Sequence, residues 1–244
     1  MQVQRGPRPA GSAASRRLAE ALRARLPGGR FEAVPGGLRN VVGALPGRRP
    51  AILIAAHYDT KDIPGFVGAN DGAGGTATVL DLARILARGR PRDPVEVRFA
   101  LFDGEESPRA TSARAFARSG LRGSKAYAAA HARELRAMVL VDFVGQRPLA
   151  LAREQGSDRA LWERLRAAAA RAGARDAFPA RQAGEVYDDH TAFERAGVPA
   201  IDLVDLAYPC LHRLCDDLAH VSAQSLRKAG GAVAGLVREL EAER

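Results

Sequence analysis

The chain has 244 residues, 46% of them hydrophobic, which is enough for one sizeable α/β domain and short for two. We therefore expect a single domain over residues 1–244. The formal net charge is +9, but only three of the cations are lysines and the arginines form no basic run, so the composition argues against a nucleic-acid partner.

No apolar run approaches the ~20 residues that span a bilayer. The first residues, MQVQRGPRPAGS, also lack the apolar core of a signal peptide. We expect a cytoplasmic protein with no membrane partner, and the composition leaves the oligomeric state open.

Apolar runs alternate with helical segments along most of the chain, which is the α/β pattern. The predicted strands are 51–56, 95–102, 137–144 and 198–204. The predicted helices are 15–25, 75–87, 123–135, 158–172 and 222–241. An early strand and turn could lie in 37–50, and no clear period follows Gly145. Three of the four predicted strands are almost continuously apolar, as expected for a sheet with helices on both faces.

Polar residues follow the predicted strands directly. HYD, at 57–59, follows the first strand; DGEE, at 103–106, follows the second; Asp142 follows the apolar residues 138–141. Open α/β sheets bind ligands at the carboxyl ends of their strands, and burying an unpaired charge is costly, so these residues are candidates for a functional site.

His57 and Asp59 point to the same side of an extended segment. Asp59 could therefore orient the imidazole of His57 toward a metal ion, although a surface pair at a strand end is the alternative. Asp71 follows in GANDGAGG, where small residues allow close approach of the backbone. Its carboxylate could bridge two cations with support from amides at the helix start, or simply cap that helix.

Glu105 and Glu106 are adjacent and can serve separate roles, one as a metal ligand and the other in proton transfer. The alternative is an ordinary acidic loop. The late segments DDH and YPCLHRLCDD add His190 and His212 to the polar clusters. The acidic pair at 216–217 could orient His212 or begin a solvated helix.

Cys210 and Cys215 bracket His212, a spacing compatible with thiolate ligation of a metal or with a short disulfide. A second Cys/His pair is missing, and cytosolic proteins rarely keep disulfides. We therefore favour small buried packing residues, and their role stays open.

The motifs HYD, GANDGAGG, DGEE, VLVDF, DDH and a late YPxxH followed by aspartate occur in this order. With them, the chain from GPRPAGS onward resembles the co-catalytic zinc aminopeptidases and their relatives the glutaminyl cyclases, peptidase family M28. The resemblance implies a zinc-exopeptidase (phosphorylase/hydrolase-like) fold, a three-layer αβα arrangement with a mostly parallel mixed central sheet. It also implies one or two Zn²⁺ ions and a peptide or small aminoacyl substrate with a free amino-terminus.

Carried over residue by residue, the resemblance implies that Asp71 bridges, that Glu106 and His212 bind one zinc, and that His57 and Asp142 bind the other. Glu105 would be the general acid/base, with Asp59 and Asp188 as further catalytic residues. The residues expected at the substrate are Lys61, Asp189, His190 and Leu211.

The two branches of the family catalyse different reactions, and the sequence resembles both. Lys61 in HYDTK, the segments GLRGSKAY and LWERL, and Asp188 in DDH resemble cyclases, in which residues matching Asp142 and Asp188 form a proton network with the glutamate. However, no Trp follows DGEE, and Leu211 stands where cyclases have Trp, whereas cyclisation requires a tight aromatic pocket.

We therefore favour aminopeptidase hydrolysis, which two ions would assist. Glutaminyl-peptide cyclisation, which needs one ion, is the alternative. A third hypothesis is a non-catalytic binding protein of the same fold.

Overall fold

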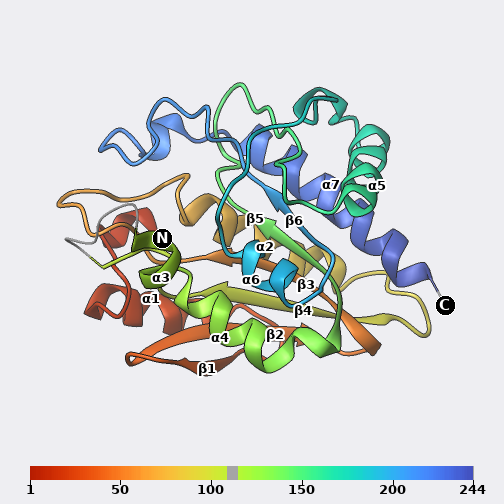
Figure 1. Ribbon diagram of the computed structural model, residues 1–244, viewed down its shortest axis with the longest axis horizontal. Helices are drawn as coiled ribbons and strands as arrows, with labels where there is room; N and C mark the ends of the chain where they lie inside the picture. Colours follow the sequence, from red (N-terminus) through yellow and green to blue (C-terminus); the bar gives the residue numbers. More distant parts are fainter. Residues whose placement is uncertain (109–114, 244) are drawn as a thin grey trace.

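The computed structural model describes residues 1–108 and 115–243, and its centre is a six-stranded mixed sheet (Figure 1). The spatial order of the strands is β1-β2-β4-β3-β5-β6. β3 pairs in parallel with β4 and β5, and β5 pairs in parallel with β6, whereas β1, β2 and β4 pair antiparallel. The strands are β1 (Arg30–Val34), β2 (Leu38–Leu45), β3 (Arg48–His57), β4 (Val95–Phe102), β5 (Leu135–Val141) and β6 (Ala200–Leu203).

Helices cover both faces of this sheet (Figure 1). Helices α1, α2, α5 and α7 contribute to the larger core on one face, and α4 and α6 to the smaller core on the other. The α-helices are α1 (Ala13–Arg23), α2 (Ala73–Leu86), α3 (Phe116–Ser119), α4 (Arg122–His131), α5 (Arg159–Arg171), α6 (His190–Arg195) and α7 (Ala223–Ala242). Short 3-10 segments are η1 (Val3–Arg5), η3 (Ala132–Glu134), η4 (Arg175–Ala177) and η5 (Leu218–His220).

The two cores follow from the period-2 alternation of the central strands. In β3, Ile52 and Ile54 belong to the larger core, while Leu53 and Ala55 belong to the smaller one. All four side chains are fully buried, so both faces of this strand are covered. The predicted three-layer αβα fold with a mostly parallel sheet is confirmed.

Helix α2 lies very close to the sheet, and the glycines of GANDGAGG make this possible. A Cβ atom on Gly75 would lie 2.1 Å from the carbonyl oxygen of Val141 in β5. Any larger residue would push the helix away from the strand. The small residues therefore allow the segment that begins at Asp71 to lie close to the sheet.

The predicted elements match the structure in their cores and differ at their ends. The strand predicted at 137–144 ends at Val141, and the helix predicted at 123–135 ends at His131, before Leu135 begins β5. The early strand and turn correspond to β2, while β1 was missed. Among the described residues, no helix combines the length and apolar character that crossing a membrane requires.

Candidate metal centre and active site

Polar side chains converge at the carboxyl-terminal edge of the parallel strands. His57 ends β3 opposite Phe102, the last residue of β4, so the DGEE segment begins directly beside it. Asp142 follows β5, the other neighbour of β3. The cavity at this edge has a volume of about 490 Å³ and is lined by Lys61, Asp71, Glu105, Glu106, Ser107, Phe116, Asp142, Phe143, Val186, Tyr187, Asp188, Leu206 and His212.

Asp71 stands between two groups of potential metal ligands. Its Oδ1 lies 3.3 Å from His57 Nε2, which is also 3.4 Å from Asp142 Oδ1. Its other oxygen, Oδ2, lies 3.6 Å from His212 Nε2, beside Glu106. Within each group the ligand atoms lie within 4.8 Å of one another. Asp71 thus belongs to both three-residue groups and faces each with a different carboxylate oxygen.

We call the five residues His57, Asp71, Glu106, Asp142 and His212 the cradle. Asp71 Oδ2 and Asp142 Oδ1 are buried and have no hydrogen-bond partner among the described residues. Buried polar atoms without a partner are costly, and a bound cation would satisfy these oxygens. Imidazole and carboxylate donors suit zinc. The residues of the cradle therefore fit the expected Zn²⁺ ions.

Asp59 supports both His57 and the DGEE segment. Its carboxylate is fully buried and accepts hydrogen bonds from the backbone amides of Glu105 (3.3 Å) and Glu106 (3.2 Å). Its Oδ1 also lies 3.6 Å from His57 Nδ1. A carboxylate on the second ring nitrogen orients a metal-binding histidine, as the sequence predicted. These contacts make Asp59 a positioning residue.

Asp216 holds the backbone of the Asp71 segment, a role that sequence reasoning missed. It accepts hydrogen bonds from the amides of Asn70 (2.8 Å) and Asp71 (3.0 Å), and from the Tyr208 hydroxyl (2.9 Å). Of the two alternatives for the pair at 216–217, orientation of His212 is not seen among the described contacts, whereas Asp217 does begin a short helix as the N-cap of η5. The helix-cap alternative for Asp71 is wrong, because Gly72 is the N-cap of α2.

Arg8 is a second anchor that the sequence did not reveal. Its side chain is fully buried and donates to the carbonyl oxygens of Tyr58 (3.0 Å), Val67 (2.5 Å) and Gly68 (3.0 Å). It therefore connects the end of β3 to the segment that leads to Asp71. One arginine among many in the chain carries no local sequence signal for this role.

His212 lies on a loop that a disulfide closes. Cys210 and Cys215 are bonded to each other, so the expectation of two packing cysteines is wrong. His212 has a positive φ of 54°, and its side chain is 43% exposed. It is the most exposed member of the cradle and the only one on this loop, so the disulfide restrains the ligand that has the least surrounding protein.

The model of peptidase family M28 matches residues 40–237. The chain belongs to peptidase family M28. It is 30% identical over 203 residues to Aminopeptidase YwaD of Bacillus subtilis (strain 168), covering 77% of this chain and 40% of YwaD. It is 32% identical over 117 residues to the uncharacterized protein YfbL of Escherichia coli (strain K12), covering 45% of this chain and 33% of that protein. The chain thus spans well under half the length of these relatives.

Solved structures with the same fold include a glutaminyl cyclase and an aminopeptidase precursor. Acidobacteriales bacterium glutaminyl cyclase is 27% identical with a TM-score of 0.81, over 97% of this chain and 89% of that one. A leucine aminopeptidase precursor from Bacteroides thetaiotaomicron has a TM-score of 0.84 over 100% of this chain and 94% of that one, but at 23% identity it shows the fold alone.

The M28 centre concentrates negative charge, which changes the acidity of its carboxyl groups. Burial raises the pKa of Glu105 well above its usual range, and the adjacent Glu106 adds to this. Burial and Asp71 raise the pKa of Glu106 to about 8, although the Lys61 ammonium in contact with it acts in the opposite direction. Burial likewise raises the pKa of Asp142 to about 7 despite the nearby His57. A divalent cation would favour the ionised form of each group.

The residues predicted to contact substrate, and the catalytic candidate Asp188, lie in three different places. Lys61 and the catalytic candidate Asp188 line the cavity. Asp189 and His190 instead lie behind it, fully buried, and Asp189 accepts a hydrogen bond from the Ser124 hydroxyl. Leu211 packs beside the apolar cluster that contains Phe143, Val204, Tyr208 and Cys210.

Three aromatic side chains line the cavity that sequence reasoning expected to lack aromatic walls. They are Phe116, Phe143 and Tyr187. The rings of Phe116 and Tyr187 meet edge to face at 6.2 Å, and Phe143 meets His212 at 6.1 Å. None of them lies directly after DGEE or directly before His212, the two positions where glutaminyl cyclases have tryptophan. A comparison of those two positions therefore did not predict these aromatic side chains.

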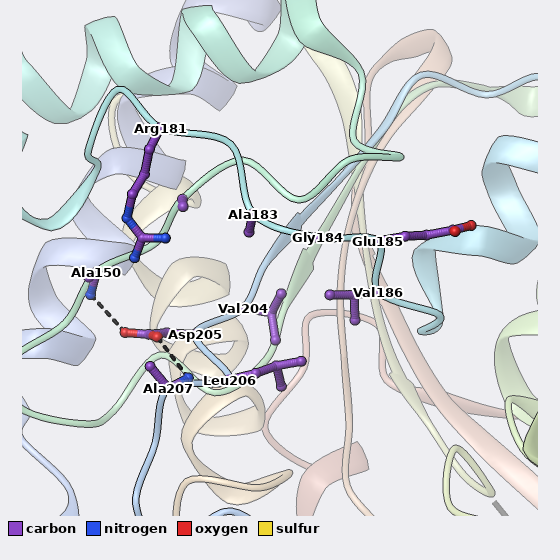
Figure 2. A pocket seen from close by; sticks show the side chains of 11 residues that line it. Ala150, Arg181, Ala183, Gly184, Glu185, Val186, Val204, Asp205, Leu206 and Ala207 are labelled. Atoms are coloured by element: carbon purple, nitrogen blue, oxygen red, sulfur yellow. Dashed lines mark hydrogen bonds between the residues drawn. The ribbon is translucent and has the colours of Figure 1, made fainter.

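A second, smaller pocket (Figure 2) shares part of its lining with the cavity at the cradle. Asp205, just after β6, accepts hydrogen bonds from the backbone amides of Ala150 (2.8 Å) and Ala207 (3.2 Å). It therefore holds together two backbone segments that line this pocket. Val186 and Leu206 border both cavities.

Proposed function

We propose that this chain is a zinc-dependent aminopeptidase, which hydrolyses the first peptide bond of a substrate with a free amino-terminus. The observation that carries the proposal is that the two oxygens of Asp71 face different histidines, His57 and His212. Two cations that share a carboxylate can together orient the attacking water and polarise the peptide carbonyl. The 30% identity to an aminopeptidase supports this choice.

Bound zinc would supply an acidic water and a Lewis acid for the carbonyl. Side chains of the protein would transfer the protons and bind the substrate. Glu105 lines the cavity beside the cradle and, as a carboxylate, would accept a proton from the water and then donate it to the departing amine. Asp188 lines the same cavity and offers a negative group for the substrate's terminal ammonium. Phe116 and Tyr187 would provide an apolar wall for its side chain.

Glutaminyl-peptide cyclisation is the second candidate, and the aromatic lining favours it. Phe116, Phe143 and Tyr187 could enclose a folded glutamine side chain, and a 27% identical solved structure is a glutaminyl cyclase. In this reaction the substrate's terminal nitrogen attacks its own side-chain amide. Glu105 would carry a proton from that nitrogen to the leaving ammonia, with Asp142 and Asp188 adjusting its pKa.

One product analysis separates these reactions. Purified, zinc-loaded protein is incubated with a leucine-initiated peptide and with its glutamine-initiated counterpart, and the products are identified by mass spectrometry. Hydrolysis releases a free amino acid and a shortened peptide. Loss of ammonia from the glutamine peptide at unchanged length, with the leucine peptide intact, would establish the cyclase instead.

The third hypothesis, a non-catalytic binding protein, is weakened by the presence of Glu105 and all five cradle residues. A protein that holds zinc but transforms neither peptide would support it. The matched control is Glu105→Gln, which should retain zinc and turn over its substrate about 10²- to 10⁴-fold more slowly.

A further inference from the structure

A second histidine surrounded by carboxylates lies behind the cavity. His190 is fully buried, and neither of its ring nitrogens makes a hydrogen bond with the described residues. Its Nε2 lies 3.4 Å from Glu154 Oε1 and 3.6 Å from Glu194 Oε1. Its Nδ1 lies 3.5 Å from Asp202 Oδ2. Three acidic groups thus face one imidazole in the interior of the protein.

The spacing of this cluster matches that of the cradle. In the cradle, the distances from His57 Nε2 to its two carboxylates are 3.3 and 3.4 Å, and Asp59 lies 3.6 Å from the other ring nitrogen. Around His190 the corresponding distances are 3.4, 3.6 and 3.5 Å. A metal-binding imidazole commonly has a carboxylate on its second ring nitrogen. Among the described residues, both His57 and His190 have carboxylates placed in this way.

Separate elements bring these side chains together. His190 and Glu194 are four residues apart on α6 and so lie on one face of the helix. Glu154 comes from the segment after β5, where its carboxylate accepts hydrogen bonds from the amides of Gly156 (2.8 Å) and Ser157. A Cβ atom on Gly156 would lie 2.9 Å from Glu194 Oε1 and 3.3 Å from Glu154 Oε1, so the glycine leaves room for both carboxylates.

Polar atoms in the cluster are left without partners, as in the cradle. Glu194 Oε1 and both carboxylate oxygens of Asp202 are buried and accept no hydrogen bond from the described residues. Such groups are costly unless a cation or a proton compensates them. The side chain of Glu194 is 25% exposed, which gives a cation an entry path and leaves space for water as a further ligand.

We propose that Glu154, His190 and Glu194 bind a divalent cation of the zinc or manganese class, with Asp202 orienting His190. This site shares no residue with the cradle. One imidazole and two carboxylates suit these ions. The cation would tie α6 to the segment after β5 and thereby hold Asp188, two residues before His190, at the wall of the cavity. The inference does not depend on which reaction the cradle catalyses.

Metal content tests the proposal. Wild-type protein and Glu154→Gln/Glu194→Gln are loaded with zinc, passed through a desalting column and analysed by inductively coupled plasma mass spectrometry. We expect the double variant to hold one zinc per chain fewer. Glu185→Gln, the same change at an exposed neighbour, should leave the content unchanged. Equal zinc content in wild type and double variant would overturn the proposal and assign the cluster to a buried imidazolium.

A thermal measurement separates this site from the cradle. In the cradle variant Asp71→Asn/His212→Ala, added zinc should raise Tm by about 5 °C if it reaches ~100 times its Kd. Adding Glu194→Gln to that variant should remove the rise. Because Glu194→Gln leaves Glu154 in place, this test remains valid even if replacement of Glu154 disturbs the segment that carries it. A zinc-induced rise in Tm that is undiminished by Glu194→Gln would contradict the proposed metal site.

Discussion

At the residue scale, Glu105 and Glu106 are neighbours with different contacts. Glu106 joins Asp71 and His212 in one metal group, whereas Glu105 belongs to neither group and lines the cavity. Asp59 fixes both through their backbone amides, so the two carboxylates are held in a defined relation. This arrangement separates proton transfer from metal binding.

The separation leads to a prediction for Glu105→Gln. The variant should keep the zinc content of the wild type, because Glu105 is not a cradle residue, but lose about 10²- to 10⁴-fold in turnover, because a glutamine cannot accept the proton. His212→Ala should lose zinc as well as activity. Turnover and zinc content are measured on the same samples, and near-normal activity of Glu105→Gln would show that the assigned mechanism is wrong.

The acidity of the cradle predicts proton release on metal binding. In the metal-free protein, Glu106 with a pKa of about 8 and Asp142 with a pKa of about 7 carry protons at pH 7 that zinc must displace. Burial lowers the pKa of His212 to about 4, so its ring is already neutral. Zinc affinity should therefore rise from pH 6 to pH 8. Calorimetry in buffers of different ionisation enthalpy measures the protons, and titration without proton release would contradict these pKa values.

At the scale of elements, the loop from β6 to η5 carries His212 without help from regular structure. The Cys210–Cys215 disulfide and the hydrogen bonds of Asp216 restrain it. A ligand on a restrained loop binds metal with less loss of conformational freedom.

Removal of the disulfide should therefore weaken zinc binding. We expect Cys210→Ser/Cys215→Ser to lower zinc affinity by about 10-fold, the scale of losses seen when groups that orient a metal ligand are removed. Competition with a chromogenic chelator measures the affinity, and circular dichroism confirms the fold. Affinity equal to that of the wild type would mean that the loop holds His212 without the bond.

Strands β3 to β6 were predictable because their apolar runs are long, whereas β1, with the sequence RFEAV, has no such run. His57, Glu106 and Asp142 were predictable as site residues for the same reason, because they follow adjacent strands, whereas Asp71 and His212 were assigned through the family resemblance. The anchors Arg8 and Asp216 were not predictable, because they contact backbone atoms distant in sequence. The rings of Phe116 and Tyr187 were not predictable either, since they reach the cavity from irregular or short segments that show no period.

At the scale of the whole molecule, one sheet edge organises the chemistry of the chain. The cradle lies where β3, β4 and β5 end, and the His190 cluster joins α6, β6 and the segment after β5 behind the cavity. The cytoplasmic location expected from the sequence stays a prediction, and the Cys210–Cys215 disulfide is the structural feature to weigh when it is tested.

We propose that Asp71 bridges two zinc ions, and diffraction at the zinc absorption edge distinguishes two ions from one. Crystals of the zinc-loaded protein should show two anomalous peaks in the cradle, one between His57 and Asp142 and one between Glu106 and His212, with Asp71 contacting both. A single peak beside Glu106 and His212, with His57 bonded to Asp142 instead of metal, would contradict the two-ion account.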